Sequence, residues 1–308
     1  MSISLDMSSA QNRKAGTSNV ITSFSSSSSS SSSYPTSSTS CSIIVPAFRE
    51  NLNIRPLVTR LFNAFRSHPS FSTEFRDVEI IIVDDNSNDG SVETVSKLES
   101  EGYNVRIVVR TSERGLSSAV VRGFREAKGE RMICMDADLQ HPPESVPALL
   151  LSITEKTPFV LGTRYGQGVS MDKDWPLHRK IISTGARMLA RPLTSASDPM
   201  SGFFGISKKD FANADVNINA QGFKIALDLL VKSGVERNHG ISEVAFSFGI
   251  RQQGESKLDA KVMLKYLEQL SELYRFRFGI LPILFVVMVM LVLILYIWSN
   301  VVSPVLRS

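Results

Sequence analysis

Two aspartates one residue apart are the sharpest chemical signal in this sequence. Asp136 and Asp138 lie in the segment MDADLQHPP, and Gln140 continues the same spacing. Residues two apart on an extended chain point to the same side, so both carboxylates can reach one divalent cation. Carboxylate and amide oxygens suit Mg²⁺ or Mn²⁺ bridging a diphosphate better than they suit zinc. The spacing therefore predicts a site for Mg²⁺ or Mn²⁺ at Asp136, Asp138 and Gln140.

Acidic residues also follow two other short apolar runs. The first run leads to Glu50, and the second leads directly into Asp84 and Asp85. An acid after a parallel strand can simply cap the next helix, and capping is the simpler interpretation for Asp85 and Asp89. Three acid-bearing strand ends that meet in one crevice indicate instead a site for ribose hydroxyls, a metal, or both.

Other catalytic chemistries find less support. Glycoside hydrolysis needs two carboxyl groups on opposite sides of the sugar, not two adjacent chelating groups. The sequence contains no Gly-x-Ser-x-Gly turn, no obvious catalytic triad and no Walker lysine motif. Its histidines, His68, His141, His178 and His239, lack metal-ligand spacing and are expected to be packing or surface residues. Phosphate binding must therefore come from arginines, lysines and the metal.

The elements that position these residues alternate along the chain. Short apolar runs take turns with amphipathic stretches, which is typical of α/β proteins. The expected strands are 42–45, 78–83, 105–109 and 131–135, and the expected helices are 52–65, 90–98 and 116–127. Strands that are hydrophobic throughout are expected between two helical layers. We predict a Rossmann-like, three-layer α/β/α fold with a mostly parallel sheet, which binds its ligands at the carboxyl ends of the strands.

The two ends of the chain differ from this middle part. Residues 1–40 contain 18 serines and three charged residues, and a tract this poor in apolar residues is expected to be disordered. Residues 280–298 are all hydrophobic except Pro282, and as a helix they are long enough to span a bilayer. Basic residues are more numerous before this run than after it, which places the large domain in the cytosol. The expected organisation is a disordered head at 1–40, a cytosolic catalytic domain at 41–278, a transmembrane helix at 279–302 and a short tail at 303–308.

Two amphipathic stretches lie between the sheet and the apolar run. Residues 175–191 carry Arg179, Lys180, Arg187 and Arg191 but no acid, together with apolar residues. A basic amphipathic helix of this kind can lie on an anionic membrane, and the alternative is a helix packed on the sheet with a solvated basic face. The neighbouring apolar run favours the membrane interpretation. Residues 258–274 are also amphipathic and are expected to form a packed connector. Both are therefore predicted to be interface helices.

Ordered sequence blocks across residues 42–278 resemble those of the dolichyl-phosphate mannose synthases, which are inverting GT-A glycosyltransferases of family 2. The blocks are IIVPAFRE, IIIVDDNSNDGS, RGLSSAVVRGF, MDADLQHPP, LGTRY, DPMSGFFG and RQQGESKL. A single C-terminal anchor is similar to the yeast-type, one-polypeptide form. That resemblance implies a GT-A fold and no obligatory protein subunit.

The resemblance also implies roles for individual residues. The guanosine part of GDP-mannose corresponds to Pro46, Phe48, Glu50, Val83 and Asp84, and the metal and diphosphate site corresponds to Asp136, Ala137, Asp138 and Gln140. Contacts to the sugar nucleotide or the acceptor phosphate correspond to Arg164, Arg251 and Lys257, and further acceptor-phosphate ligands to Arg179 and Ser183. The implied catalytic residues are Asp136, Asp138 and Arg164. Phe48 departs from the pattern, because a tyrosine is common there, which puts one hydrogen bond in doubt.

The implied reaction is transfer of mannose from GDP-mannose to dolichyl phosphate with inversion, which gives dolichyl β-D-mannosyl phosphate, the mannose donor for N-glycosylation, O-mannosylation and GPI-anchor synthesis. The implied location is the endoplasmic reticulum membrane, single-pass, with a cytosolic catalytic domain and a lumenal tail. No nucleic acid is expected as a partner. Two alternatives stay open: a dolichyl-phosphate glucosyltransferase that uses UDP-glucose, and a membrane-tethered sugar-nucleotide-binding protein without turnover.

Overall fold

The computed structural model describes residues 39–69, 75–165, 177–220, 224–247, 260–280, 288 and 290–292. The predicted head lies outside this part of the chain except for Thr39 and Ser40, and so does most of the predicted transmembrane helix. Among the described residues, no helix is both long enough and apolar enough to cross a membrane. The spanning helix at 279–302 therefore stays a prediction.

The elements follow the predicted alternation of strands and helices. The strands are β1 (Thr39–Ala47), β2 (Phe75–Asp84), β3 (Val105–Val109), β4 (Arg131–Cys134), β5 (Phe159–Thr163), β6 (Phe204–Ser207) and β7 (Ile241–Ala245). The helices are α1 (Asn51–Ser67), α3 (Ser91–Ser100), α4 (Leu116–Glu126), η1 (Pro143–Ser145), α5 (Val146–Ser152), α6 (Leu177–Ala190), α7 (Lys208–Asp215), α8 (Ile225–Lys232), α9 (Val235–Asn238) and α10 (Ala260–Phe278). The strands and helices expected between residues 42 and 278 are present, with their ends shifted by a few residues.

The strands form one sheet in the order β3-β2-β1-β4-β6-β5-β7. Strands β3, β2, β1 and β4 run parallel, β6 is antiparallel to both of its neighbours, and β5 pairs with β7 in parallel. The prediction of a mostly parallel sheet is confirmed. The reversed strand β6 separates the parallel strands that lead to Asp84 and Asp136 from the strand that leads to Arg164.

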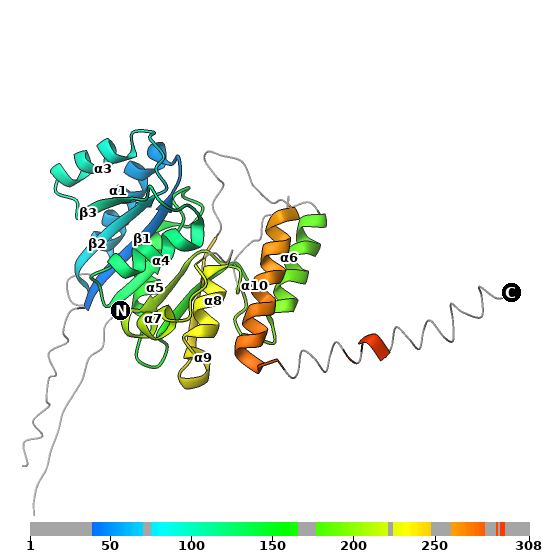
Figure 1. The fold of residues 1–308 in the computed structure, drawn as a ribbon. Helices are drawn as coiled ribbons and strands as arrows, with labels where there is room; N and C mark the ends of the chain where they lie inside the picture. Colours follow the sequence, from blue (N-terminus) through cyan, green and yellow to red (C-terminus); the bar gives the residue numbers. More distant parts are fainter. Residues whose placement is uncertain are drawn as a thin grey trace, which may run out of the picture. The chain divides into compact units, whose positions relative to one another are not determined.

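Helices cover both faces of the sheet (Figure 1). Alternate strand residues explain why: Ile43 and Ile80 pack in a core with α1, α3 and α5, whereas Ile44 and Ile81 pack in a second core with α4, α7 and α8. Successive side chains of a strand point to opposite faces, so a continuously apolar strand supplies both cores. The three-layer architecture predicted from the sequence is confirmed.

Helices α6 and α10 lie side by side and form a third apolar cluster with α8 (Figure 1). Two tyrosines of α10 also bond the backbone of α6. The hydroxyl of Tyr266 donates to the carbonyl of Ala186 (2.6 Å), and that of Tyr274 donates to the carbonyl of Leu189 (2.8 Å). Helix α10 is therefore packed against the domain, as expected for a connector.

Candidate active site

The carboxyl ends of β1, β2 and β4 meet at one edge of the sheet. In the register, Pro46 lies opposite Val83, and Ala47 lies opposite Asp84. The amide of Asp85 donates to the carbonyl of Ala47 (3.1 Å). Because neighbouring parallel strands end together, the predicted guanosine residues and the two predicted metal-binding aspartates share this edge.

The segment after β4 is held by hydrogen bonds within itself. The backbone amide of Asp136 donates to Nδ1 of His141 (3.0 Å), and the amide of Gln140 donates to Oδ1 of Asp138 (3.1 Å). Leu139 between them adopts a left-handed conformation, with φ of 64°. The side chain of Asp136 is 39% exposed, whereas Asp138 is buried. The carboxylate of Asp138 is thus held inside the protein, whereas that of Asp136 is accessible to solvent.

His141 is buried and packs against this segment from inside the protein. Its ring stacks on Phe203 with centroids 5.0 Å apart and meets the edge of Phe246 at 5.6 Å. Burial lowers the pKa of His141, against the opposing effect of the carboxylates of Asp136 and Asp138. A nitrogen that accepts a hydrogen bond carries no proton, so the contact with the amide of Asp136 requires the neutral tautomer of His141 in which Nε2 alone is protonated. This arrangement agrees with the packing role expected for the histidines.

A buried carboxylate orients Arg164 at the end of β5. Nε of Arg164 donates to Oδ2 of Asp198 (2.8 Å), and Nη2 donates to Oδ1 (2.9 Å). Burial opposes the charge of Arg164, but the hydrogen bonds and charge of Asp198 outweigh it and raise the pKa above its ordinary value. Two-point pairing of this kind fixes the plane of the guanidinium. Arg164 is therefore a permanent, oriented cation.

The segment that contains Asp198 also reaches the aspartate pair. The amide of Gly162 donates to the carbonyl of Phe203 (2.8 Å), which joins β5 to this segment. A Cβ atom at Gly202 would lie 3.5 Å from Oδ2 of Asp136. The block DPMSGFFG thus bridges the ends of β4 and β5, and it brings Arg164 to the same site as Asp136.

Lys224 is a site residue that sequence reasoning missed. It directly precedes α8, and its Nζ donates to the carbonyl of Met200 (3.4 Å). Burial lowers the pKa of Lys224, and the charge of Arg164 lowers it further, whereas Asp136 and Asp198 act in the opposite direction. These three charges act on Lys224 because all four side chains lie in one region. The one sequence signal was a lysine at the start of a mostly apolar helical run.

An aromatic ring flanked by two arginines marks the end of β1. Phe48 is 39% exposed, and the guanidinium carbons of Arg49 and Arg114 lie 5.2 and 5.6 Å from its ring centre. Glu50 follows, and its carboxylate accepts a hydrogen bond from the side-chain amide of Asn53 (2.6 Å). Sequence reasoning assigned no role to Arg114, although it is the first residue of the block RGLSSAVVRGF.

A hollow of about 290 Å³ opens beside the end of β2. Asp84 in its lining is buried and accepts hydrogen bonds from the amide of Ser87 (2.8 Å) and from the Ser87 hydroxyl. The lining residues are Asp84, Asn86, Asn88, Asp89, Gly90, Ser91, Val92, Glu93 and Val109. Oxygen acceptors of this kind can receive hydrogen bonds from a ribose or a nucleobase.

The two acids expected to cap helices have different roles. The carboxylate of Asp85 accepts from Nε of Arg110 (2.7 Å) and from the backbone amide of Gly115 before α4 (2.8 Å), so the expectation that it caps the next helix, α3, is wrong. Arg110 directly follows the neighbouring strand β3, and its charge holds the carboxylate there. Asp89 accepts from the backbone amides of Ser91 and Asn51, both at 3.1 Å. It thus accepts hydrogen bonds from the first backbone amides of α3 and α1, as capping requires.

The predicted acceptor residues are only partly described. Ser183 lies half-buried on α6. The guanidinium carbon of Arg187 lies 4.3 Å from the ring centre of Tyr165, which places α6 beside the end of β5. Arg179 belongs to α6, but its side chain lies outside the described residues, as do Arg251 and Lys257 entirely.

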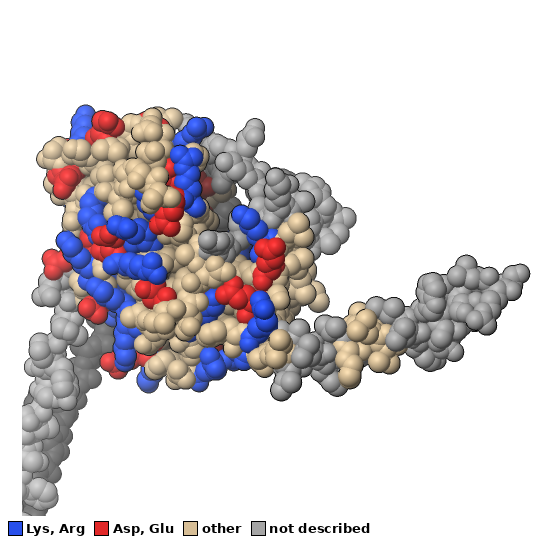
Figure 2. All heavy atoms as spheres, viewed as in Figure 1, with Lys and Arg blue, Asp and Glu red and all other residues tan. Residues whose placement is uncertain are grey.

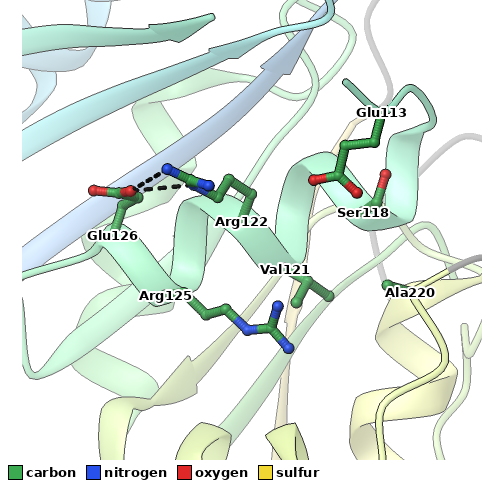
Figure 3. A pocket seen from close by; sticks show the side chains of 7 residues that line it. All are labelled: Glu113, Ser118, Val121, Arg122, Arg125, Glu126 and Ala220. Carbon is green, nitrogen blue, oxygen red and sulfur yellow. Dashed lines mark hydrogen bonds and ion pairs between the residues drawn. The ribbon is translucent and has the colours of Figure 1, made fainter. Parts of the chain in front are cut away.

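A second hollow, of about 360 Å³, lies on the outer face of α4 and differs from this site (Figure 3). Its lining residues are Glu113, Ser118, Val121, Arg122, Arg125, Glu126 and Ala220. Arg122 pairs with Glu126 (2.7 Å), and Arg125 pairs with Asp215 (2.9 Å). Figure 2 likewise shows blue and red side chains side by side on this face of the molecule. Both arginines already have carboxylate partners, and no predicted site residue lines this hollow.

The donor set after β4 fits a hard cation held together with a substrate. Within the described ranges, no three His, Cys, Asp or Glu side chains gather closely enough to hold a metal ion by themselves. Mg²⁺ characteristically takes one or two protein carboxylates and completes its shell with water and substrate phosphates. Asp136 and Asp138 supply the carboxylates, and Gln140 adds an amide. These residues fit a divalent cation that binds with a diphosphate.

Comparisons with known proteins agree with this geometry. Residues 42–213 match glycosyl transferase family 2. A dolichol-phosphate mannosyltransferase of Mycosarcoma maydis is 71% identical over 310 residues, with 100% of both chains covered, and one of Saccharomyces cerevisiae is 58% identical over 245 residues, with 79% of this chain and 90% of the relative covered. Glucosyl-3-phosphoglycerate synthase of Mycobacterium tuberculosis, in complex with Mn²⁺ and UDP, has a similar fold, with a TM-score of 0.55, 20% identity, and 78% of this chain and 80% of that one covered. The chain therefore belongs to glycosyl transferase family 2 and, within it, to the dolichol-phosphate mannosyltransferases.

Proposed function

We propose that this protein transfers mannose from GDP-mannose to dolichyl phosphate and inverts the anomeric carbon. One observation carries the proposal: the Asp136–Asp138 segment lies beside the oriented cation Arg164 and the buried Lys224, at the carboxyl edge of the sheet. Such a site offers ligands for a metal-bound diphosphate next to cations for a second phosphate. The names of the relatives supply the sugar and the lipid.

The donor binds across the ends of β1, β2 and β4. Phe48 offers an apolar ring face to the guanine, and Asp84 offers oxygen acceptors beside the hollow at β2. Asp136, Asp138 and Gln140 would hold Mg²⁺ or Mn²⁺, which acts as a Lewis acid for the charge that develops on the departing GDP. Asp136 is the more exposed carboxylate and so the one more accessible to a cation that binds together with the diphosphate.

The acceptor phosphate needs cations more than it needs a base. A phosphate monoester has a second pKa near 6, so its oxygen is already an anionic nucleophile at cytosolic pH. Arg164 is held in one orientation by Asp198 and can grip two phosphate oxygens, and Lys224 adds a second positive charge. These residues reduce the repulsion between two anionic substrates and align them for in-line attack.

Membrane attachment is also proposed, with the catalytic domain on the cytosolic face of the endoplasmic reticulum and the segment 279–302 across the bilayer. Supporting features are the run of apolar residues at 280–298 and the apolar side chains exposed on two adjacent helices. Met188 on α6 is 66% exposed, and Leu264 on α10 is 62% exposed. A lipid surface would cover this apolar area and would bring the phosphate of dolichol to the site.

A transfer assay tests the reaction. Full-length protein in lipid is given GDP-mannose or UDP-glucose with a short polyprenyl phosphate and Mg²⁺ or Mn²⁺. We expect mannosyl transfer without any added protein subunit, and preferential glucose transfer would contradict the mannose assignment. Asp138→Ala should abolish metal-dependent transfer in a folded protein. Unchanged activity of this variant would refute the metal role, whereas nucleotide binding without transfer by the unaltered protein would favour the binding-protein alternative.

A further inference from the structure

The side chain of Gln269, on α10, forms hydrogen bonds with both the amide and the carbonyl of the Lys224 backbone. Oε1 of Gln269 accepts a hydrogen bond from the amide of Lys224 (2.9 Å), and Nε2 of Gln269 donates to the carbonyl of Lys224 (3.1 Å). Gln269 is 3% exposed, so both bonds are shielded from water. The side-chain amide of Gln269 thereby satisfies both backbone polar groups of Lys224, as a neighbouring strand would do in a sheet.

These bonds act where the chain has no regular secondary structure. Lys224 precedes α8 with φ of −115° and ψ of 79°. Its carbonyl also accepts the amide of Asp228 (3.1 Å), which begins the hydrogen bonding of the helix. Fixing both backbone groups of a residue limits rotation about φ and ψ, and these angles set the direction of the Cα–Cβ bond from which its side chain extends. The direction of the Lys224 side chain therefore depends on Gln269.

We propose that Gln269 is a positioning residue, which holds Lys224 toward the phosphates and thereby links the geometry of the active site to α10. The inference rests on the proposed function, in which Lys224 meets a substrate phosphate. Helix α10 ends at Phe278, immediately before the apolar segment 280–298. The helix that leads into the proposed anchor thus also carries the residue that orients a cation of the site.

The competing explanation is that Gln269 only helps to dock α10. The same helix offers a matched control in Glu272, which accepts hydrogen bonds from Nζ of Lys232 (2.6 Å) and from the side-chain amide of Asn219 (2.5 Å). Glu272→Ala removes two polar contacts of α10, as Gln269→Ala does, but neither of them involves Lys224. A purely structural role would make the two variants alike.

The kinetic test uses the full-length protein in lipid, with GDP-mannose and a short polyprenyl phosphate. We expect Gln269→Ala to lower kcat/KM about tenfold, because binding energy is lost when a charged group is misplaced. Gln269→Glu keeps the acceptor for the Lys224 amide but sets a carboxylate against its carbonyl, so its loss should be at least as large. Glu272→Ala should lower the melting temperature to a similar degree and leave kcat and both KM values within about twofold of the unaltered protein.

A double-mutant cycle decides whether Gln269 acts through Lys224. Once the side chain is removed in Lys224→Ala, adding Gln269→Ala should change kcat/KM less than about twofold. Independent, multiplicative losses would overturn the inference, as would an unaltered kcat/KM of Gln269→Ala or an equal kinetic loss in Glu272→Ala. If the unaltered protein transfers no mannose, the proposed function fails and this inference fails with it. If it transfers mannose and Gln269→Ala matches it, the positioning role alone fails.

Discussion

Two lysines at opposite ends of α8 show how burial can be used in different ways. Lys232, the last residue of the helix, is 2% exposed at its side chain and pairs with Asp228 (3.0 Å) and Glu272 (2.6 Å). Lys224, just before the helix, donates to a carbonyl, and the cation Arg164 is among the charges that act on it. Carboxylates neutralise the first charge within the fold. The second lies near the cation Arg164 as well as near the carboxylates of Asp136 and Asp198, and proximity to a like charge is costly for the fold. In the proposed function this cost serves the binding of a substrate anion.

The largest expected effect comes from Lys224→Met. This change removes the charge and keeps much of the side-chain volume, so the protein should stay folded. We expect kcat/KM for mannosyl transfer to fall by about 10²- to 10³-fold, the typical loss when one charge-stabilising donor is removed from an active site. Steady-state kinetics together with the melting temperature measure both effects. Near-normal transfer would place Lys224 with the structural charges.

Lys232→Met should have the opposite profile. It leaves the carboxylate of Asp228 buried without its cation, which typically costs about 3 kcal/mol of unfolding free energy. The fraction of protein that stays folded should transfer mannose at the normal rate. Urea unfolding measures the stability, and kcat per folded molecule measures the activity. The double variant Asp228→Asn with Lys232→Met should recover part of the lost stability, and failure to recover any would contradict this account of the pair.

A smaller effect is expected from Asp198→Asn, which weakens the two-point contact that orients Arg164. An amide keeps one acceptor but presents a donor to the other guanidinium nitrogen, so the plane of Arg164 should shift. We expect kcat/KM to fall about tenfold to a hundredfold, since a small displacement of an aligning group can have that effect. Asp215→Asn is the matched control, because Asp215 pairs with the exposed Arg125 away from the site. Equal losses in the two variants would show that the effect is not local.

The smallest effect is expected at an exposed pair, which adds a third case to the comparison. Arg60 donates two hydrogen bonds to Glu144, and they lower the pKa of Glu144. A lowered pKa in the folded state gives stability that is present above the ordinary pKa of glutamate and is lost as the pH falls through the lower value. Glu144→Gln should therefore cost less than about 1 kcal/mol near neutral pH, and nothing at a low pH at which Glu144 is protonated in the folded protein as well. Urea unfolding at both pH values checks this, and a loss of the same size at low pH would contradict it.

The sequence predicted most of the scaffold. The central residues of the strands are apolar on both faces, and Glu50, Asp84 and Asp136 lie at or shortly after the strand ends. This pattern indicated both the strands and their place between two helical layers. The Asp136–Asp138 pair was evident because both partners lie within three consecutive residues. Asp85 was misjudged, since its partner Arg110 follows another strand, β3.

Residues that depend on distant partners were not predictable in this way. Lys224 and Asp198 belong to segments far from Asp136 in the chain, and their importance comes from the antiparallel strand β6 and its neighbours. Gln269 looks like one polar residue among several on an amphipathic helix, and nothing local distinguishes it from Glu268 or Glu272. Burial and orientation, which arise from packing, separate these side chains.

The sequence by itself determined the alternating elements, the three-layer fold, the acids after the strands and the family, because each of these depends on spacing along a covalent chain. Only the tertiary structure decided which lysine at the ends of α8 pairs with Asp228 and Glu272 and which lies among the charges of the site. It also decided that Gln269 holds the backbone of Lys224 and that His141 supports Asp136. The physical reason is that hydrogen bonding and the energy of a buried charge depend on distances through space, which are set when strands and helices from separate parts of the chain pack together.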